Sequence, residues 1–301
     1  MESKVYSSYL SSLPPLNAVR LSAYAKHYNL PAEIIAGIMF EGLTGSYMDN
    51  LVAGMLLIAR QKGRLTDNMP VIEVSSGTFA VALTITATRL GHNVYLIVPA
   101  GANEKQLQRL AGLGACIIKA EPGHGRQGAV EQARQLEKEL NGYFLNYMSN
   151  DDNPEYHRRV TGPALLKACG KQPDIVVIGV GSGGTVTGVG EHLNAWTSGT
   201  EIVAVEPYES RVISGGFAGH HNIPGLGVGF VPDNYNPYIV NEVISVSSGD
   251  AVHTARDLFM LEGIPAAPAS GATVAVAKLL ALRPENAGKC IVPLLGIRRG
   301  I

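Results

Sequence analysis

The residues best suited to bind a ligand lie in the segment IVVIGVGSGGTVTGVGEHL, between Ile175 and Leu193. Its apolar start is typical of a buried parallel strand, a loop of small residues follows, and a helical pattern comes next. The loop residues are Gly181, Ser182, Gly183, Gly184 and Thr185. Glycines let the backbone approach an anion, hydroxyls donate hydrogen bonds, and the first N–H groups of a helix point toward bound negative charge. The segment predicts a phosphate site, although an ordinary tight turn would use the same small residues.

Alternating strand and helix patterns surround this segment. The expected strands cover residues 34–40, 71–74, 93–99, 115–120, 143–145, 175–180, 201–206 and 290–294. The expected helices cover residues 47–61, 80–90, 104–112, 128–140, 161–168 and 251–263, with further helices after the glycine loop and from about residue 269 to 282. Such alternation predicts doubly wound, parallel sheets. The glycine-rich stretch 210–238 has little periodicity, and a loop of that length in a compact domain is usually functional.

Length and composition limit the classes of function. The chain has 301 residues, of which 46% are hydrophobic and 16% charged, and its net charge is −1. This length predicts one large or two closely associated domains. The scattered basic residues disfavour nucleic acid and anionic membranes as partners. No apolar run reaches the ~18 residues of a membrane span, and the first residues carry no export signal, which favours a cytoplasmic protein.

The cysteines and histidines have no spacing that would bind a metal. The cysteines have no CxxC spacing, so we expect reduced thiols; they are Cys116, Cys169 and Cys290. The neighbours His220 and His221 have no third ligand at a recognisable spacing, so we expect no metal site. Together with His124 they could transfer protons if their loops cover a site, but solvated loop positions are the simpler interpretation. We also interpret Asp151, Asp152 and Glu155 as a hydrated turn, and Trp196 as a residue packed at a helix end.

Several motifs in a fixed order identify a related family. They are VIEVSSGTFAVAL, GHNVYLIVPAG, DNPEYHRRVTGP, GVGSGGTVTGVG, VAVEPYES, IPGLGVGFVP, ASGATVAVA and RPENAGKCIV. From end to end the chain resembles the cysteine synthase branch of the fold-type II pyridoxal-phosphate (PLP) enzymes, which contains O-acetylserine sulfhydrylase and cystathionine β-synthase. The resemblance implies an α/β, tryptophan synthase β-like fold with two doubly wound domains of mostly parallel sheet. It further implies a larger domain that comprises residues 1–40 and 151–301, a smaller, mobile domain that comprises residues 41–150, and a homodimer.

The smaller domain is thus expected at 41–150, and the cofactor site on the larger one. In such enzymes the glycine loop binds the PLP phosphate, and residues 181–185 keep that pattern. A serine near the C-terminus hydrogen-bonds the pyridine nitrogen, and Ser270 matches it, although a serine before Gly-Ala also caps helices. The resemblance therefore implies that the cofactor-binding residues are retained.

The lysine that defines the chemistry is not retained. In these enzymes a Ser-x-Lys-Asp-Arg pattern carries the lysine that forms the Schiff base with PLP and moves the substrate α-proton. Here residues 46–50 read Ser-Tyr-Met-Asp-Asn, so Met48 takes the lysine position. A thioether can neither form an imine nor accept a proton at neutral pH. Lys62 follows the expected helix and should lie on the surface, so the family pattern assigns no catalytic residue.

The substrate loop differs as well. The family's Thr-Ser-Gly-Asn-Thr loop grips the substrate carboxylate, and here it reads Ser75, Ser76, Gly77, Thr78 and Phe79. Tyr147 stands where a glutamine-containing pair is usual. An engineered Met48 alone would not explain these further changes, which include Asn50 in place of arginine.

Two classes of function follow from this combination. The first is a non-catalytic or accessory homologue, a pseudoenzyme of amino-acid metabolism that binds PLP non-covalently or another phosphate-bearing or amino-acid ligand. The second is an enzyme of amino-acid or secondary metabolism with lysine-independent chemistry, in which Tyr47, Tyr147 or a loop histidine transfers the proton. The family's capture of a C-terminal isoleucine peptide also suggests a protein partner, either in such a groove or through Ile301, but Thr78 and Phe79 alter the carboxylate grip.

Overall fold

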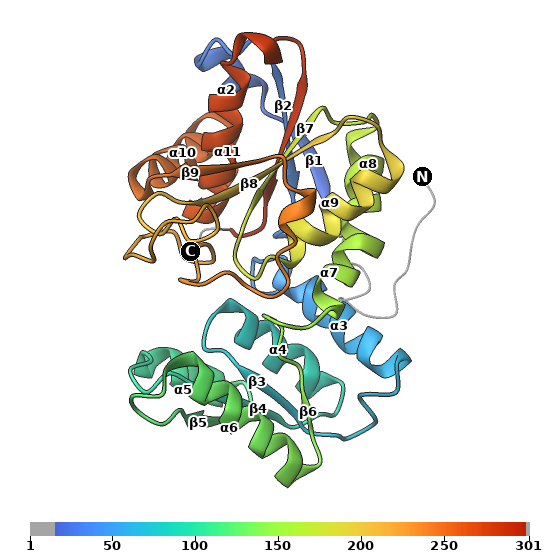
Figure 1. Ribbon diagram of the computed structural model, residues 1–301, viewed down its shortest axis with the longest axis vertical. Helices are drawn as coiled ribbons and strands as arrows, with labels where there is room; N and C mark the ends of the chain where they lie inside the picture. The colour runs from blue at the N-terminus through green and yellow to red at the C-terminus, as the bar shows by residue number, and fades with distance from the viewer. Residues whose placement is uncertain (1–15, 299–301) are drawn as a thin grey trace. The chain divides into compact units, whose positions relative to one another are not determined.

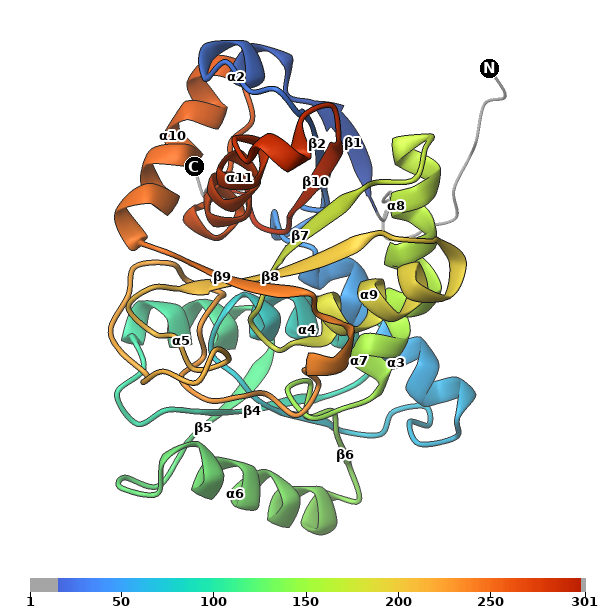
Figure 2. The ribbon, with the colours of Figure 1, turned by 45° about the horizontal axis from the view of Figure 1, so that its top comes forward.

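The computed structural model describes residues 16–298, and contacts within the chain divide them into two compact units. The small unit comprises residues 42–44 and 48–152, and the large unit comprises residues 16–41, 45–47 and 153–298. Each unit has a sheet of its own (Figures 1 and 2). Within the described residues, no helix is both long and apolar enough to cross a membrane.

The large unit is built on a six-stranded sheet with the order β1-β2-β10-β7-β8-β9. Its strands are β1 (Asn17–Arg20), β2 (Glu33–Ile38), β7 (Ile175–Gly179), β8 (Glu201–Pro207), β9 (Glu242–Val246) and β10 (Cys290–Leu295). The edge strand β1 runs antiparallel to β2, and all the other pairs are parallel. The carboxyl ends of β7 and β8 therefore lie at the same edge, where ligand sites of open α/β sheets are found.

Helices cover both faces of this sheet (Figure 1). One face packs against α2 (Ser22–His27), α10 (Ser248–Glu262) and α11 (Pro268–Ala281), and the other against α8 (Gly162–Cys169) and α9 (Gly184–Trp196). Side chains of β7 alternate between the two cores, because Ile175 and Val177 belong to one buried cluster while Val176 and Ile178 belong to the other. This two-sided burial explains the continuous apolar run of the strand.

The small unit is an all-parallel, four-stranded sheet with the order β5-β4-β3-β6. Its strands are β3 (Val71–Val74), β4 (Val94–Val98), β5 (Ala115–Lys119) and β6 (Tyr143–Phe144), and its helices are α3 (Met48–Gln61), α4 (Thr78–Arg89), α5 (Glu104–Gly112) and α6 (Gly125–Leu140). Figure 2 shows α4 and α5 on one face of the sheet and α6 on the other. This is the arrangement that right-handed crossovers give when the chain reverses direction after β5.

The α/β fold with mostly parallel sheets is confirmed, and four elements were not among the expected ones. The strands β1 and β9 and the helix α2 were missed, and α7 (Asp152–Tyr156) begins within the segment interpreted as a hydrated turn. That interpretation is wrong for Asp152, whose side chain is fully buried and pairs with Lys62 and Arg64. The helix α7 continues through a π-helical turn, His157–Thr161, and short 3-10 turns occur at Pro237–Ile239 and Pro284–Asn286.

Candidate ligand-binding site

The glycine loop joins β7 to α9 as expected from the sequence. The helix α9 begins at Gly184, and its cap residue Gly183 has a φ of 80°, a left-handed conformation that suits glycine. The first N–H groups of any helix have no partner within the helix, and the helix dipole adds positive potential there. The loop therefore presents the backbone geometry that a phosphate group requires.

The Ser182 hydroxyl can serve as a donor at this helix start. Its side chain is 5% exposed, and its oxygen accepts a hydrogen bond from Asn153 Nδ2 at 3.0 Å and a longer one from the Gly184 N–H at 3.4 Å. Both contacts use the oxygen as acceptor, so the hydroxyl proton can still be donated. The residue Asn153, from α7, thus orients the serine.

A buried chain of polar side chains fixes Thr185. Its hydroxyl lies 3.1 Å from His157 Nε2, and His157 Nδ1 lies 2.9 Å from the Thr161 hydroxyl. Burial lowers the pKa of His157 to about 3, so the imidazole is neutral at physiological pH. The Tyr47 hydroxyl also hydrogen-bonds Thr185, and burial raises the pKa of this phenol. Both rings therefore position Thr185 in uncharged form.

The glycines of the loop are also needed for packing within the protein. A Cβ on Gly183 would lie 2.7 Å from the Tyr235 backbone nitrogen, and a Cβ on Gly184 or Gly181 would collide with Asn153 or with the Gly225 carbonyl. Side chains at these positions are excluded whether or not a ligand is present. The glycines alone thus do not distinguish a phosphate site from a tight turn.

Ser270 is held by the backbone of Ile297, which follows β10. Its hydroxyl donates to the Ile297 carbonyl at 2.7 Å and accepts from the Ile297 N–H at 3.1 Å. It does not cap α11, because the cap residue is Ala267. Since a hydroxyl has one proton, Ser270 cannot also donate to a ligand in this arrangement.

The segment around Ile297 is fixed on two sides. Its neighbours pair with residues 45–47, since the Tyr47 N–H donates to Gly296 O at 2.9 Å and the Arg298 N–H donates to Gly45 O at 2.8 Å. On the other side the Ala267 N–H donates to Ile297 O at 3.0 Å. The Ser270 contact is therefore part of a continuous backbone network.

In the small unit, Met48 is the first residue of α3 and is 9% exposed. The next residue, Asp49, is buried and accepts hydrogen bonds from the Thr44 N–H at 2.9 Å and the Thr44 hydroxyl at 3.0 Å. Burial raises the pKa of Asp49. Lys62 lies beyond the end of α3, where its Nζ donates to Asp152 Oδ1 at 2.7 Å. This amine is thus committed to an ion pair with a buried carboxylate.

The loop of the small unit that was predicted to grip a substrate lies beside a stacked aromatic pair. The residues Ser75, Ser76 and Gly77 link β3 to α4, which begins at Thr78. Phe79 is 2% exposed, and its ring stacks on Tyr147 with centroids 3.8 Å apart and an interplanar angle of 12°. The structure thus brings together Phe79 and Tyr147, which were predicted to line a substrate pocket, and their rings are in direct contact.

Glu73, in β3, is a buried residue that the sequence analysis did not identify. Its carboxylate accepts from the Tyr147 N–H at 3.0 Å and from the Val74 N–H at 2.7 Å. Burial raises the pKa of Glu73 to about 7, although both hydrogen bonds and the charge of Arg126 lower it. A charged residue inside the apolar strand VIEV was the available signal. The residue ties β3 to the loop that carries Tyr147.

Comparison with known proteins decides the family. A family model described as pyridoxal-phosphate dependent enzyme matches residues 15–296. The chain belongs to this family. Cysteine synthase 3 of Caenorhabditis elegans is 37% identical over 265 residues, which cover 87% of this chain and 79% of that protein. Cysteine synthase of Haemophilus influenzae is 34% identical over 301 residues, which cover 97% of this chain and 94% of that protein.

Solved structures give the same assignment. Cysteine synthase from Entamoeba histolytica is 30% identical with a TM-score of 0.91, over 99% of this chain and 89% of that one. O-ureido-L-serine synthase is 26% identical with a TM-score of 0.90, over 98% of this chain and 92% of that one. The expected membership in the cysteine synthase branch of the fold-type II PLP enzymes is confirmed.

The residues of this PLP-family chain meet some of the requirements of the cofactor and not others. The start of α9 and the Ser182 hydroxyl suit a phosphate group. The Ser270 hydroxyl is engaged by Ile297, and Met48 carries no amine. The start of α9 thus suits a phosphate group, the Ser270 hydroxyl has no further proton to donate, and a methionine at position 48 cannot form an imine.

His124, His221 and Trp196 each make contacts elsewhere in their own unit. His124 is exposed, and its Nε2 lies 4.0 Å from Glu121. His221 is engaged by its own loop, since Nε2 contacts Gly227 O at 2.9 Å and Nδ1 accepts from the Ile223 N–H at 3.3 Å. Trp196 ends α9, is 75% exposed, and stacks on His192. Within residues 16–298 no group of three or more His, Cys, Asp or Glu side chains could hold a metal ion.

Proposed function

We propose that this protein binds a phosphate-bearing small molecule without a covalent link and does not catalyse conventional, lysine-dependent β-replacement. PLP itself is the first candidate ligand, because the family is described by its dependence on PLP. The observation that carries the proposal is that the chain has both a glycine loop with Ser182 at the start of α9 and a methionine, Met48, at the start of α3. The first can hold a phosphate, and the second cannot form an imine.

Residues around the loop would act by binding and orientation. The N–H groups of the first turn of α9 and the Ser182 hydroxyl would donate to the phosphate oxygens, with Asn153 holding the serine. Thr185 would be oriented by His157, whose neutral state avoids a charge beside the loop. When bound, PLP would bring an aldehyde and an electron-withdrawing ring, but no residue at position 48 would attach it.

An enzyme with lysine-independent chemistry is the second candidate. It is favoured by the names of the relatives, which are synthases, and by the buried hydrogen-bonded set of Tyr47, Thr185 and His157. Such a set could pass a proton along its hydrogen bonds. A homodimer, as expected from the family, is compatible with either candidate.

The proposal is tested by titrating the purified protein with PLP and with inorganic phosphate. We expect stoichiometric binding with a free-aldehyde absorbance spectrum and no adduct after borohydride reduction. The variant Ser182→Ala should weaken binding of both ligands about tenfold, the loss of one hydrogen bond to a charged group. If neither PLP nor inorganic phosphate bound, the phosphate site would be refuted. An adduct at another lysine would refute non-covalent binding.

Restoring a lysine at position 48 tests whether only the amine is missing or whether the PLP pocket is lost as well. We predict that Met48→Lys gives a borohydride-trappable adduct with PLP, detected by mass analysis. The matched control is Leu57→Lys, which adds a lysine on the same helix at a side chain that is 56% exposed. The control should give no stoichiometric adduct. Equal labelling of both variants would show that position 48 does not adjoin the bound aldehyde.

A further inference from the structure

A chain of four polar side chains runs from the core of the large unit to the start of α9. Thr161 is 1% exposed and His157 is fully buried, whereas Thr185 and Tyr47 are half-buried. His157 joins the two threonines, because its Nδ1 lies 2.9 Å from the Thr161 hydroxyl and its Nε2 lies 3.1 Å from the Thr185 hydroxyl. Tyr47 forms the third hydrogen bond, to Thr185. The chain thus ends at two residues that solvent can reach beside the glycine loop.

The Tyr47 ring is fixed beside this loop. The Tyr47 N–H donates to Gly296 O at 2.9 Å, and a Cβ on Gly296 would lie only 2.8 Å from Tyr47 Cδ1. The ring therefore packs directly on the Gly296 backbone, and its centroid lies 5.8 Å from that of His157. Burial raises the pKa of the Tyr47 phenol, so the hydroxyl keeps its proton.

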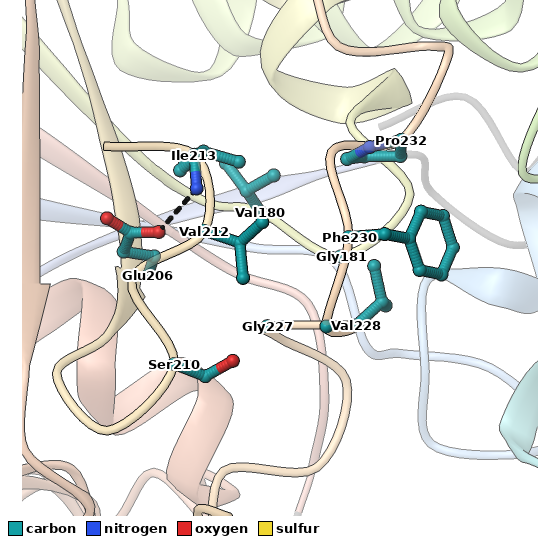
Figure 3. Close-up of a pocket in the computed structure, with 11 residues that line it drawn as sticks. Val180, Gly181, Glu206, Ser210, Val212, Ile213, Gly227, Val228, Phe230 and Pro232 are labelled. Carbon is teal, nitrogen blue, oxygen red and sulfur yellow. Dashed lines mark hydrogen bonds between the residues drawn. The ribbon is translucent and has the colours of Figure 1, made fainter. Parts of the chain in front are cut away.

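The glycine-rich stretch that borders the glycine loop elsewhere is less suited to an anion (Figure 3). Its Gly227 N–H donates to Val180 O at 3.1 Å and is therefore already used. The buried carboxyl side chain of Glu206 lines the same small pocket as Gly181, and a carboxylate repels phosphate. Hydroxyl donors for an anion at the start of α9 are thus expected from the side of Thr185 and Tyr47.

The number of protons in the polar chain limits what it can donate. Three hydroxyls and one uncharged imidazole carry four protons, and the pKa of His157, lowered to about 3, excludes a fifth at physiological pH. The three hydrogen bonds use three of these protons. One proton therefore remains, which is either donated outside the chain or left without a partner.

The buried end of the chain is a poor place for this remaining proton. If His157 carried its proton on Nδ1, it would donate to Thr161 and accept from Thr185, and the remaining proton would belong to Thr161. Among the residues that the structure describes, the Thr161 hydroxyl has no second hydrogen-bond partner. A buried donor without an acceptor costs about 1–3 kcal/mol. A proton on Nε2 reverses the direction and places the remaining proton at the accessible end.

We propose that Tyr47 and the Nε2–H group of His157 both donate to Thr185 Oγ1, so that the Thr185 hydroxyl donates its own proton to the phosphate group of the ligand. A phenol is more acidic than an aliphatic alcohol and is therefore the stronger donor, which sets the direction of the bond between Tyr47 and Thr185. Tyr47 is thus a positioning residue, and the site selects an oxyanion whose oxygens accept hydrogen bonds. This inference rests on the phosphate site proposed above.

The test measures the affinity of the whole protein and its variants for inorganic phosphate by calorimetric titration. Thr185→Val removes the donor and should weaken binding about tenfold, whereas Tyr47→Phe removes only the orienting hydroxyl and should weaken it about threefold. Because Tyr47 acts through Thr185, the double variant should bind no more weakly than Thr185→Val alone. The matched control is Tyr156→Phe, which removes a buried phenol whose ring centroid lies 5.3 Å from that of His157. It should leave the affinity unchanged.

NMR of the protein without ligand gives an independent readout, because long-range proton–nitrogen correlations show which ring nitrogen of His157 carries the proton. Comparison with His157→Gln assigns this signal among the eight histidines. We expect the proton on Nε2, and this spectrum decides if Thr185→Val does not fold. A proton on Nδ1, an unchanged affinity in Tyr47→Phe, or additive losses in the double variant would overturn the inference while phosphate still binds. Failure of the parent to bind phosphate would refute the phosphate site itself.

Discussion

At the scale of one residue, Phe79 is part of the packed core beside the loop that was predicted to grip a substrate. Its ring is almost fully buried and stacked on Tyr147. We predict that Phe79→Thr, which restores the residue implied by the family pattern, lowers the free energy of unfolding by about 3 kcal/mol, because it leaves a cavity and removes the ring contact. Phe79→Leu fills more of that space and should cost less than half as much. Urea unfolding checks both values, and a loss below about 0.5 kcal/mol for Phe79→Thr would show that the ring does not support the loop.

Single residues were predictable where their role depends on local pattern, and not where it depends on distant partners. The glycine loop and Met48 follow from neighbouring residues in the sequence. Glu73 is buried because it accepts from the Tyr147 backbone, and Glu206 because the chain folds back to Ile213. Asp152 is buried through Lys62 and Arg64. Such long-range pairing has no signature in a single sequence.

At the scale of elements, the strand segment around Ile297 determines what Ser270 can do. The family pattern implies a contact to a ring nitrogen, whereas the serine here closes a pair of hydrogen bonds with Ile297. We predict that Ser270→Ala lowers the free energy of unfolding by about 1–2 kcal/mol, since the Ile297 N–H loses its acceptor. The affinities for PLP and inorganic phosphate should change equally or not at all. A selective loss of PLP affinity, measured against phosphate as the control, would show that Ser270 contacts the ring instead.

Elements with strong periodicity were predicted well, and the missed ones share a physical cause. The buried strand β7 and the helix α3 have clear apolar patterns. The strand β9 lies at the edge of its sheet and is mostly half-buried, so its pattern is weak. The strand β1 is also an edge strand, and half of it is exposed. The short helix α7 is polar, and it is stabilised by contacts that the sequence does not reveal.

At the scale of the whole molecule, the two units carry buried groups that respond to pH in opposite directions. In the small unit, the pKa of Glu73 is raised to about 7. Its contribution to stability is present below the ordinary glutamate pKa and is lost as the pH rises to about 7. In the large unit, the pKa of His157 is lowered to about 3. Its contribution is present above the ordinary histidine pKa and is lost as the pH falls below it.

We predict that variants of these two residues separate the responses. When the pH is raised from about 5 to about 8, the free energy of unfolding of the parent should fall by about 2–3 kcal/mol relative to that of Glu73→Gln. When the pH is lowered from about 8 to about 5, the free energy of unfolding of the parent should fall by about 2 kcal/mol relative to that of His157→Gln. Chemical unfolding at a series of pH values gives both differences. Parallel pH profiles for the parent and both variants would mean that neither group titrates with a shifted pKa, whereas opposite slopes would show that acid stabilises one unit while it weakens the other.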